Sequence, residues 1–228
     1  MSRLWPEPLT VTLAPGAARL TGADPVKSAR GDWDGALEAM EQALEKRRGR
    51  VTLILSNRFF RLHLAPPQPA GLRSREIEGF LRHSLETTFE EDFSAWQLRW
   101  QPRPPGEPLA VCAFPSVQMA EIKARLGPRL RLARLAPWFA TQRLAPSACL
   151  VQAEGEHLTV VAQHKGRWRL FTQLRAAEDA VATLRQRMPL LDACPGQPWG
   201  PVHLHGLAPS VALPAGWSHA AAASSMPA

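Results

Sequence analysis

One stretch of the sequence decides the fold: Val51-Thr-Leu-Ile-Leu-Ser-Asn-Arg-Phe-Phe-Arg-Leu-His-Leu-Ala-Pro66. It opens with β-branched and aliphatic residues, passes Ser56-Asn57, and continues as a second run from Phe59 to Leu64. Two such runs around a Ser-Asn step predict two strands joined by a tight turn. The first run is apolar on both faces, which is typical of a central strand covered by helices. We therefore expect an antiparallel hairpin in the core.

The composition is that of a globular protein. The chain has 228 residues, of which 45% are hydrophobic and 21% charged, so it has ample length for a core. No apolar run reaches the ~18 residues of a membrane span, and the first residues lack the apolar core of a secretory signal. Three widely spaced cysteines, Cys112, Cys149 and Cys194, are typical of reduced, buried thiols. We therefore expect a cytoplasmic protein.

The formal charge of +7 is carried almost entirely by arginines that are spread along the chain. The densest clusters are Lys46–Arg50 and Arg125–Arg134. This distribution favours a solvated basic surface over a nucleic-acid-binding patch, which remains an alternative based on charge alone. A mild attraction to the negative cytoplasmic face of a membrane is also compatible with it.

The rest of the chain alternates strands with amphipathic helices, and turn residues separate them. The expected elements are a hairpin over 8–21 that turns at Pro15-Gly16, helices over 34–48, 74–89 and from Ser116, strands over 96–100, 109–114 and 129–135, a short helix at Pro137, a three-stranded meander over 149–172, a helix over 176–188 and a strand over 201–206.

The order of these elements repeats. The last block reads β-β-β-α-β, and the first half is a longer version with an insertion at about 94–126. We therefore predict an α/β protein with mixed sheets, in the duplicated ribonuclease-H-like or actin-like arrangement. The predicted parts are a first half over 1–147, a second half over 148–210 and a low-complexity tail over 211–228.

Four stretches make the chain resemble a known family: Val51–Pro66, Phe89–Trp96, Arg131–Pro137 and Gly166–Leu170. They are similar to the actin-like scaffolds of bacterial type IV pilus and type II secretion machines, namely PilM-type proteins and the cytoplasmic domains of GspL-type proteins. The resemblance covers about residues 8–208 in element order. It implies a cytoplasmic scaffold beneath the inner membrane that holds the tail of a membrane partner or the assembly ATPase. A homodimer remains open.

Actin-like ATPases carry an Asp-x-Gly turn in each half, where glycine admits phosphate and aspartate positions the metal ion. The corresponding turns here are Ser56-Asn57-Arg58 and Ala153-Glu154-Gly155, and the adenosine side has the single Gly206. We therefore expect no enzyme activity and no nucleotide cofactor. The alternative is a nucleotide-binding protein with unorthodox loops.

The strand over 96–100 supplies most of the candidate partner-binding residues. Trp96 and Trp100 lie on one face of it, beside Arg99 and Arg103, and this combination suits an extended peptide added along a sheet edge. Phe60 joins the set because Phe59 and Phe60 point to opposite faces of their strand. The simpler interpretation of the two tryptophans is core packing.

Other polar groups give weaker signals. His203 and His205 have a spacing that can hold zinc, but without further ligands they are better read as ordinary strand histidines. Glu90-Glu91-Asp92 is read as a solvated run at a helix end rather than as catalytic carboxylates. No Gly-x-Ser-x-Gly elbow supports a hydrolase. We therefore expect no metal site and no catalytic residues.

Overall fold

The computed structural model describes residues 8–104, 106–128, 130–175, 182–184, 186, 201–207 and 218–219. They form two compact units. The first takes residues from 8–60 and 115–142, and the second from 61–114 and 143–219. The first unit is therefore built from two separate segments of the chain. The boundaries expected from the sequence at 147 and 210 stay a prediction.

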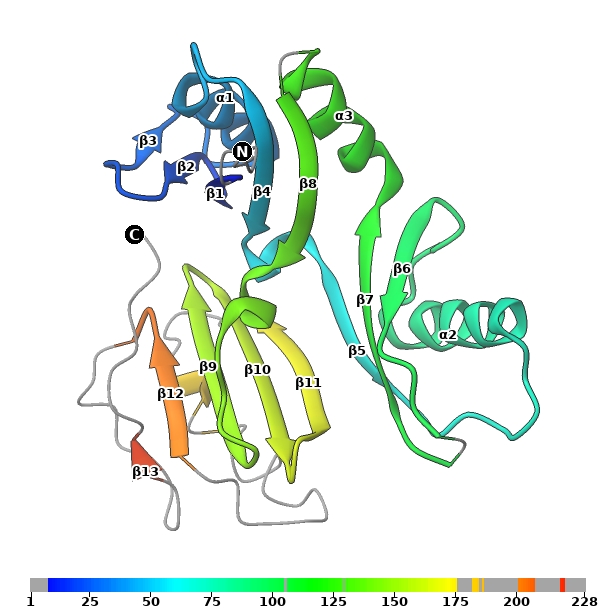
Figure 1. The fold of residues 1–228 in the computed structure, drawn as a ribbon. Coiled ribbons are helices and arrows are strands. Elements are labelled where there is room, and N and C mark those ends of the chain that lie inside the picture. Colours follow the sequence, from blue (N-terminus) through cyan, green and yellow to red (C-terminus); the bar gives the residue numbers. More distant parts are fainter. Residues whose placement is uncertain are drawn as a thin grey trace, which may run out of the picture. The chain divides into compact units, whose positions relative to one another are not determined.

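The first unit contains a mixed five-stranded sheet with the order β3-β2-β1-β4-β8 (Figure 1). Strands β1 and β2 are antiparallel around Gly16, whose φ of 68° is the left-handed conformation that glycine favours. This confirms the predicted first hairpin. Strand β4 lies between β1 and β8 and is parallel to both. The strands are β1 (Leu9–Ala14), β2 (Ala17–Leu20), β3 (Val26–Lys27), β4 (Gly49–Leu55) and β8 (Leu130–Pro137).

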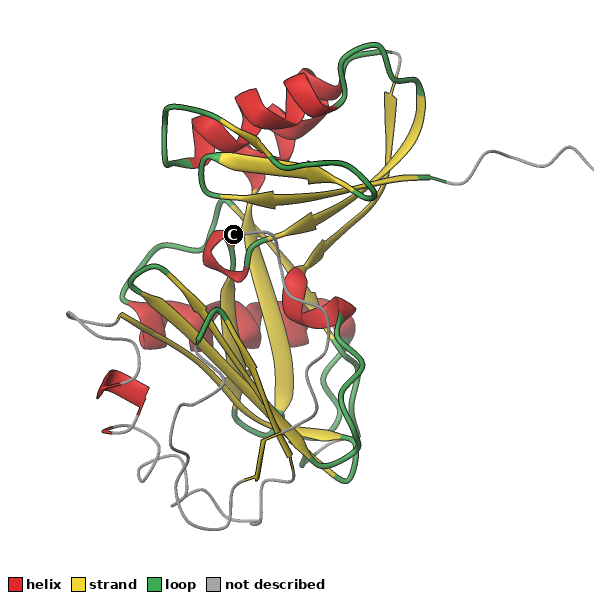
Figure 2. Ribbon diagram, turned by 90° about the vertical axis from the view of Figure 1, so that its left-hand side faces the viewer, coloured by secondary structure: helices red, strands yellow, loops and turns green. Residues whose placement is uncertain are grey.

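Helices α1 (Trp33–Ala43) and α3 (Ser116–Leu126) lie side by side on one face of this sheet (Figure 2). The indole N–H of Trp33 donates to Glu121 Oε2 at 2.6 Å and joins the two helices. The carboxylate of Asp32, rather than Asp34, caps α1 by accepting from the Gly35 N–H at 2.9 Å. The helix ends before the expected residue 48 because Lys46 adopts a left-handed φ of 66°.

The prediction of a hairpin over Val51–Pro66 is wrong. Both strands exist, but they do not pair with each other. The chain leaves β4, makes a single 3₁₀ turn (η1, Asn57–Phe59) and enters β5 (Arg61–Ala65), which pairs with β7 in another sheet. The physical reason is that both edges of β4 are already occupied by β1 and β8. A strand that follows β4 therefore has no edge of it to pair with.

The second unit begins with a three-stranded sheet in the order β5-β7-β6, covered on one face by α2 (Figure 1). Helix α2 (Ser74–Phe89) has the bounds expected from its apolar stripe. Strands β6 (Trp96–Trp100) and β7 (Leu109–Pro115) confirm the two predicted strands. Their common core consists of Ala65, Leu81, Leu85, Phe93, Leu98, Leu109, Val111 and Ala113.

The other sheet of the second unit has the order β11-β10-β9-β12-β13. Its antiparallel β9, β10 and β11 confirm the predicted meander, and β12 adds in parallel to β9. Strand β11 lies beside β5, where the Leu62 N–H donates to Gln173 Oε1 at 3.1 Å. The predicted helix over 176–188 lies mostly outside the described residues, and of the predicted tail over 211–228 only residues 218–219 are described, as strand β13. The strands are β9 (Ala148–Glu154), β10 (His157–His164), β11 (Arg167–Arg175), β12 (Pro201–His205) and β13 (Ser218–His219).

Two helical glycines offer a matched test of packing. A Cβ on Gly35 would lie 1.9 Å from the carbonyl oxygen of Arg30, whereas a Cβ on Gly79 would meet nothing within 4 Å. We expect Gly35→Ala to lower the free energy of unfolding by about 1–3 kcal/mol, because the backbone must move apart. Gly79→Ala should raise it by up to about 1 kcal/mol, because alanine is the better helix former. Urea unfolding checks both, and a neutral Gly35→Ala would contradict the described contact.

Candidate functional site

Strand β6 is an open edge of the second unit. It pairs with β7 on one side, and no described strand pairs with its other side. The opposite edge of the same small sheet, β5, lies against β11 instead. Within the part of the chain that the structure describes, β6 is therefore the edge of this small sheet at which another strand could be added.

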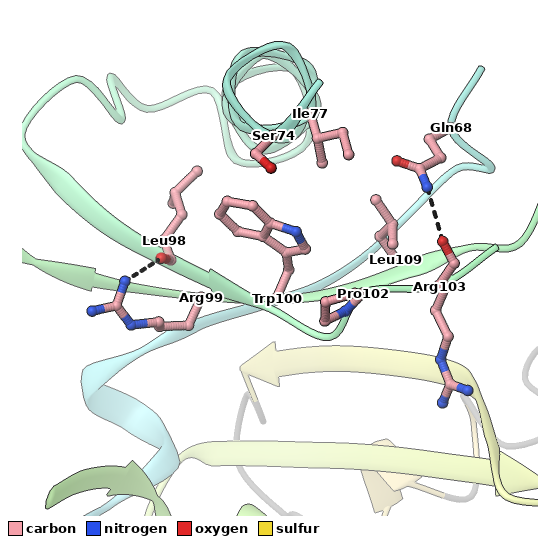
Figure 3. A pocket seen from close by; sticks show the side chains of 9 residues that line it. All are labelled: Gln68, Ser74, Ile77, Leu98, Arg99, Trp100, Pro102, Arg103 and Leu109. Atoms are coloured by element: carbon pink, nitrogen blue, oxygen red, sulfur yellow. Dashed lines mark hydrogen bonds between the residues drawn. The ribbon is translucent and has the colours of Figure 1, made fainter. Parts of the chain in front are cut away.

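The two faces of β6 have different surroundings. Trp96, Leu98 and Trp100 face α2, and Leu98 is 4% exposed. Arg99 points to the opposite face and is exposed (Figure 3). The alternation predicted for this strand is therefore observed.

Trp96 contributes mainly to the aromatic core at the start of β6. Its ring centroid lies 4.7 Å from that of Phe93. The guanidinium carbon of Arg61 lies 5.7 Å from the ring centroids of both Trp96 and Phe89, and its NH2 lies 2.7 Å from Glu91 Oε1. Trp96 therefore stabilises the strand and offers little surface to a partner.

Arg82 of α2 fixes the beginning of β6. Its guanidinium donates to the carbonyl oxygens of Phe93 and Trp96 and forms an i,i+4 ion pair with Glu78 at 3.1 Å. A single side chain therefore links the helix to the two backbone groups at which the edge strand starts.

Trp100 lies in a pocket of about 350 Å³ at the other end of β6. Its ring lies between the strand and the first turn of α2, next to Ser74 and Ile77 (Figure 3). The loop before α2 contributes Gln68, whose side-chain amide donates to the carbonyl oxygen of Arg103 at 3.0 Å. The lining residues are Gln68, Ser74, Ile77, Leu98, Arg99, Trp100, Pro102, Arg103 and Leu109.

The pocket gathers three of the predicted partner-binding residues, namely Arg99, Trp100 and Arg103. Phe60 does not join them, because it is 2% exposed at the end of η1 in the first unit. A side chain this buried is not available to a partner, and Phe60 is a core residue in the structure. Sequence reasoning missed Gln68, although its position between prolines in Pro66-Pro67-Gln68-Pro69 marks a rigid loop.

The turn after β4, which was expected to correspond to the first phosphate turn of actin-like ATPases, is held by hydrogen bonds within the chain. The strand orders β3-β2-β1-β4 and β11-β10-β9-β12 instead make the β1–β2 turn at Gly16 the counterpart of the β9–β10 turn at Gly155. Ser56 and Asn57 are fully buried. Ser56 Oγ accepts from the Arg58 N–H at 3.1 Å, and Asn57 Oδ1 accepts from the Phe139 N–H at 3.1 Å. Both side-chain oxygens thus accept hydrogen bonds from the protein's own backbone.

The corresponding turns of the second unit are also engaged in local structure. Gly155 has φ +57° between β9 and β10, and the neighbouring Glu156 pairs with Arg175 at 3.0 Å. Gly206 has φ +71°, and a Cβ on it would lie 2.1 Å from the carbonyl oxygen of Ala153. Close packing against β9 therefore accounts for this glycine.

The other polar residues considered in the sequence analysis have local roles in the fold. His203 and His205 lie in β12, where burial lowers the pKa of both, and no cluster of three metal-ligating side chains occurs among the described residues. Glu90 takes the left-handed conformation that ends α2, and the Ser94 N–H lowers the pKa of Asp92 by donating to it. Burial raises the pKa of the Cys112 thiol, which is therefore unreactive.

Comparison with protein-family models gives no match, and no curated protein matches the sequence. Solved structures do match. The cytoplasmic domain of EpsL, an inner membrane component of the type II secretion system of Vibrio cholerae, has a TM-score of 0.57 and 17% identity over 96% of this chain and 89% of that chain. A protein of unknown function from Bacteroides thetaiotaomicron with an actin-like ATPase fold has a TM-score of 0.50 and 10% identity over 89% and 82%.

This chain has an actin-like fold. The PilM–PilN type IV pilus biogenesis complex also matches, with a TM-score of 0.51 and 18% identity over 82% of this chain and 68% of that chain. The resemblance stated from the sequence is thereby confirmed at the level of the fold, as is the predicted fold class. Among the described helices, none is both long and apolar enough to cross a membrane.

The role of Arg82 can be tested by hydrogen exchange. We expect Arg82→Met to speed amide exchange in residues 93–97 by at least tenfold, because the carbonyls that start β6 lose their shared donor. His83→Gln changes an exposed neighbour on the same helix and should leave these rates unchanged. Equal exchange in both variants would show that Arg82 does not hold the strand.

The turn after β4 gives a stability prediction. Asn57→Ala leaves the buried Phe139 N–H without its acceptor, and we expect the free energy of unfolding to fall by about 1–3 kcal/mol. Gln42→Ala on the exposed face of α1 serves as the control and should change it by less than about 0.5 kcal/mol. Urea unfolding of both variants is the measurement, and a change for Asn57→Ala no larger than the control's contradicts the assignment.

Proposed function

We propose that this protein is a non-catalytic scaffold in the assembly platform of a type IV pilus or a type II secretion system. In this role it binds a peptide tail of an inner-membrane partner or of the assembly ATPase. The observation that carries the proposal is the pocket around Trp100 at the open edge of β6. The fold shared with the EpsL cytoplasmic domain and with PilM, which was solved together with PilN, supports the assembly context.

An extended peptide suits this edge for two reasons. The outward backbone groups of an edge strand provide hydrogen bonds to an added strand, and a neighbouring pocket provides side-chain selectivity. The pocket walls are mainly apolar, and Arg99 and Arg103 lie beside them. Aromatic and arginine side chains of this kind dominate the binding energy of protein interfaces.

The proposal includes the absence of ATP hydrolysis. Its support is the pair of equivalent turns between β1 and β2 and between β9 and β10, Ala14-Pro15-Gly16 and Glu154-Gly155-Glu156, which contain a glycine but no aspartate. In actin-like ATPases such an aspartate positions the metal ion that accompanies the phosphates. On this proposal the protein is cytoplasmic and reaches the inner membrane through its partner.

The binding role is tested with fluorescently labelled peptides that cover the cytoplasmic tails of inner-membrane proteins encoded beside this chain. We expect saturable binding of at least one tail, and at least tenfold weaker binding to Trp100→Ala, because a buried aromatic anchor is lost. Val117→Ala, which trims a side chain 64% exposed on α3, should bind as the parent does.

Urea unfolding confirms that Trp100→Ala is folded, and Arg103→Glu provides a second variant that keeps the aromatic core. Loss of binding in a folded variant supports the site. Absence of binding to every tail, including that of the assembly ATPase, would overturn the proposed function.

The lack of nucleotide chemistry has its own test. Titration with a fluorescent ATP analogue and magnesium should give no saturable signal up to about millimolar concentration, a range in which binding free energies are near −4 kcal/mol. Saturable micromolar binding would instead identify a nucleotide-binding protein with unorthodox loops.

A further inference from the structure

The Trp100 pocket contains a buried hydrogen-bond acceptor that the protein leaves unused. Gln68 is 8% exposed, and its Oε1 has no hydrogen-bond partner among the described residues. The side-chain nitrogen donates to the Arg103 carbonyl oxygen at 3.0 Å, so the orientation of the amide is determined by this bond. Figure 3 shows the Gln68 oxygen turned to the side on which Ile77 lies.

An unpaired buried acceptor is unfavourable, and most such groups in native proteins have a partner. Gln68 is also held from the backbone side, because its carbonyl oxygen accepts from the Gly106 N–H at 3.3 Å. The side chain therefore cannot easily turn outward to water. The oxygen itself has almost no accessible surface, so a ligand satisfies it by displacing the groups that cover it and bringing an N–H or O–H donor in their place.

The walls around this oxygen favour an aromatic group. Ile77, Leu98, Leu109 and Pro102 supply apolar surface, and Trp100 supplies a flat ring on which a second ring can stack. A volume of about 350 Å³ is at the lower end of the ~300–1,000 Å³ of ligand pockets. It holds one large side chain, whereas a nucleotide or similar cofactor needs more space.

The charges around the pocket select against a cationic ligand. Arg99 and Arg103 line it, and Arg99 has no carboxylate partner in the described part of the chain. Arg103 donates to the neutral oxygens of Gln101 and Gly166. These two guanidinium groups repel lysine or arginine and attract carboxylates.

We infer that the pocket binds a tryptophan or tyrosine side chain of an acidic peptide that adds along β6, and that the ring N–H or O–H donates to Gln68 Oε1. This rests on the proposed function, since it names the class of peptide that the β6 edge takes. The neutral donor satisfies Gln68, the ring stacks on Trp100, and aspartate or glutamate residues on either side pair with the arginines.

The experiment uses two synthetic peptides with a fluorescent label, each with one aromatic residue between stretches of aspartate and glutamate. One peptide contains tryptophan and the other 1-methyltryptophan, which has the same ring but lacks the N–H. We expect the tryptophan peptide to bind the full chain at least tenfold more tightly, because the methylated ring leaves Gln68 Oε1 unpaired. Replacing the acidic residues by lysine should abolish binding.

The variant Gln68→Met keeps the length of the side chain and removes the acceptor. We expect it to bind both peptides equally, while His83→Gln, at a distance on α2, keeps the preference for tryptophan. Urea unfolding confirms that the Gln68→Met protein is folded. Loss of the preference in Gln68→Met alone assigns the hydrogen bond to Gln68.

Three results with the synthetic ligands would overturn the inference. These are equal binding of the two peptides to the parent chain, binding of neither, and binding of free N-acetyltryptophanamide as tight as that of the peptide, which would indicate a small-molecule site. A partner tail that binds without sensitivity to Gln68 or Trp100 also overturns it and leaves the scaffold function standing. Conversely, N–H-dependent binding of the synthetic peptide without binding of any tail supports the pocket and overturns the proposed function.

Discussion

The hydrogen bond from the Phe139 N–H to Asn57 Oδ1 joins the two segments from which the first unit is built, at the end of the paired strands β4 and β8. Asn57 follows β4, and Phe139 lies in the short 3₁₀ helix η2 (Trp138–Thr141) that follows β8. Both parallel strands thus end at the same buried amide. Because Ser56 N–H also donates to the Leu13 carbonyl oxygen at 2.7 Å, the ends of β1, β4 and β8 are joined at one point.

This junction explains the route of the chain. The 3₁₀ turn, with Asn57 buried, ends β4, and the residues of the second unit begin at Arg61. The residues between Arg61 and Phe114 then build the small sheet and α2, including the edge on which the proposed function depends.

Elements with a local signal could be predicted from the sequence. The apolar stripe of α2 gave both of its ends, and the alternation in Trp96–Trp100 gave a strand with the correct residues facing the core. The pairing of β4 could not be predicted in this way, because its partners β1 and β8 lie far from it in the sequence. A hairpin was therefore expected where two strands are adjacent only in sequence.

The same distinction applies to the site. Trp100, Arg99 and Arg103 could be predicted to lie together because aromatic and basic residues are close in the sequence in and just after one strand, and their binding role stays a prediction. Phe60 could not be placed correctly, because its burial depends on packing that the sequence does not display. Gln68 had no recognisable signal, since its unused acceptor arises only when its nitrogen meets the Arg103 carbonyl.

The shortness of β6 bears on how long a complex lasts. The strand has 5 residues, and the guanidinium of Arg82 already binds the carbonyl at its start. About half of the N–H and C=O groups of a strand point to either side, so few remain for an added peptide. Backbone pairing alone would give a brief residence time, and the dissociation rate would be governed by the side chain in the pocket. An edge of this kind favours rapid exchange of a bound peptide over a long-lived complex.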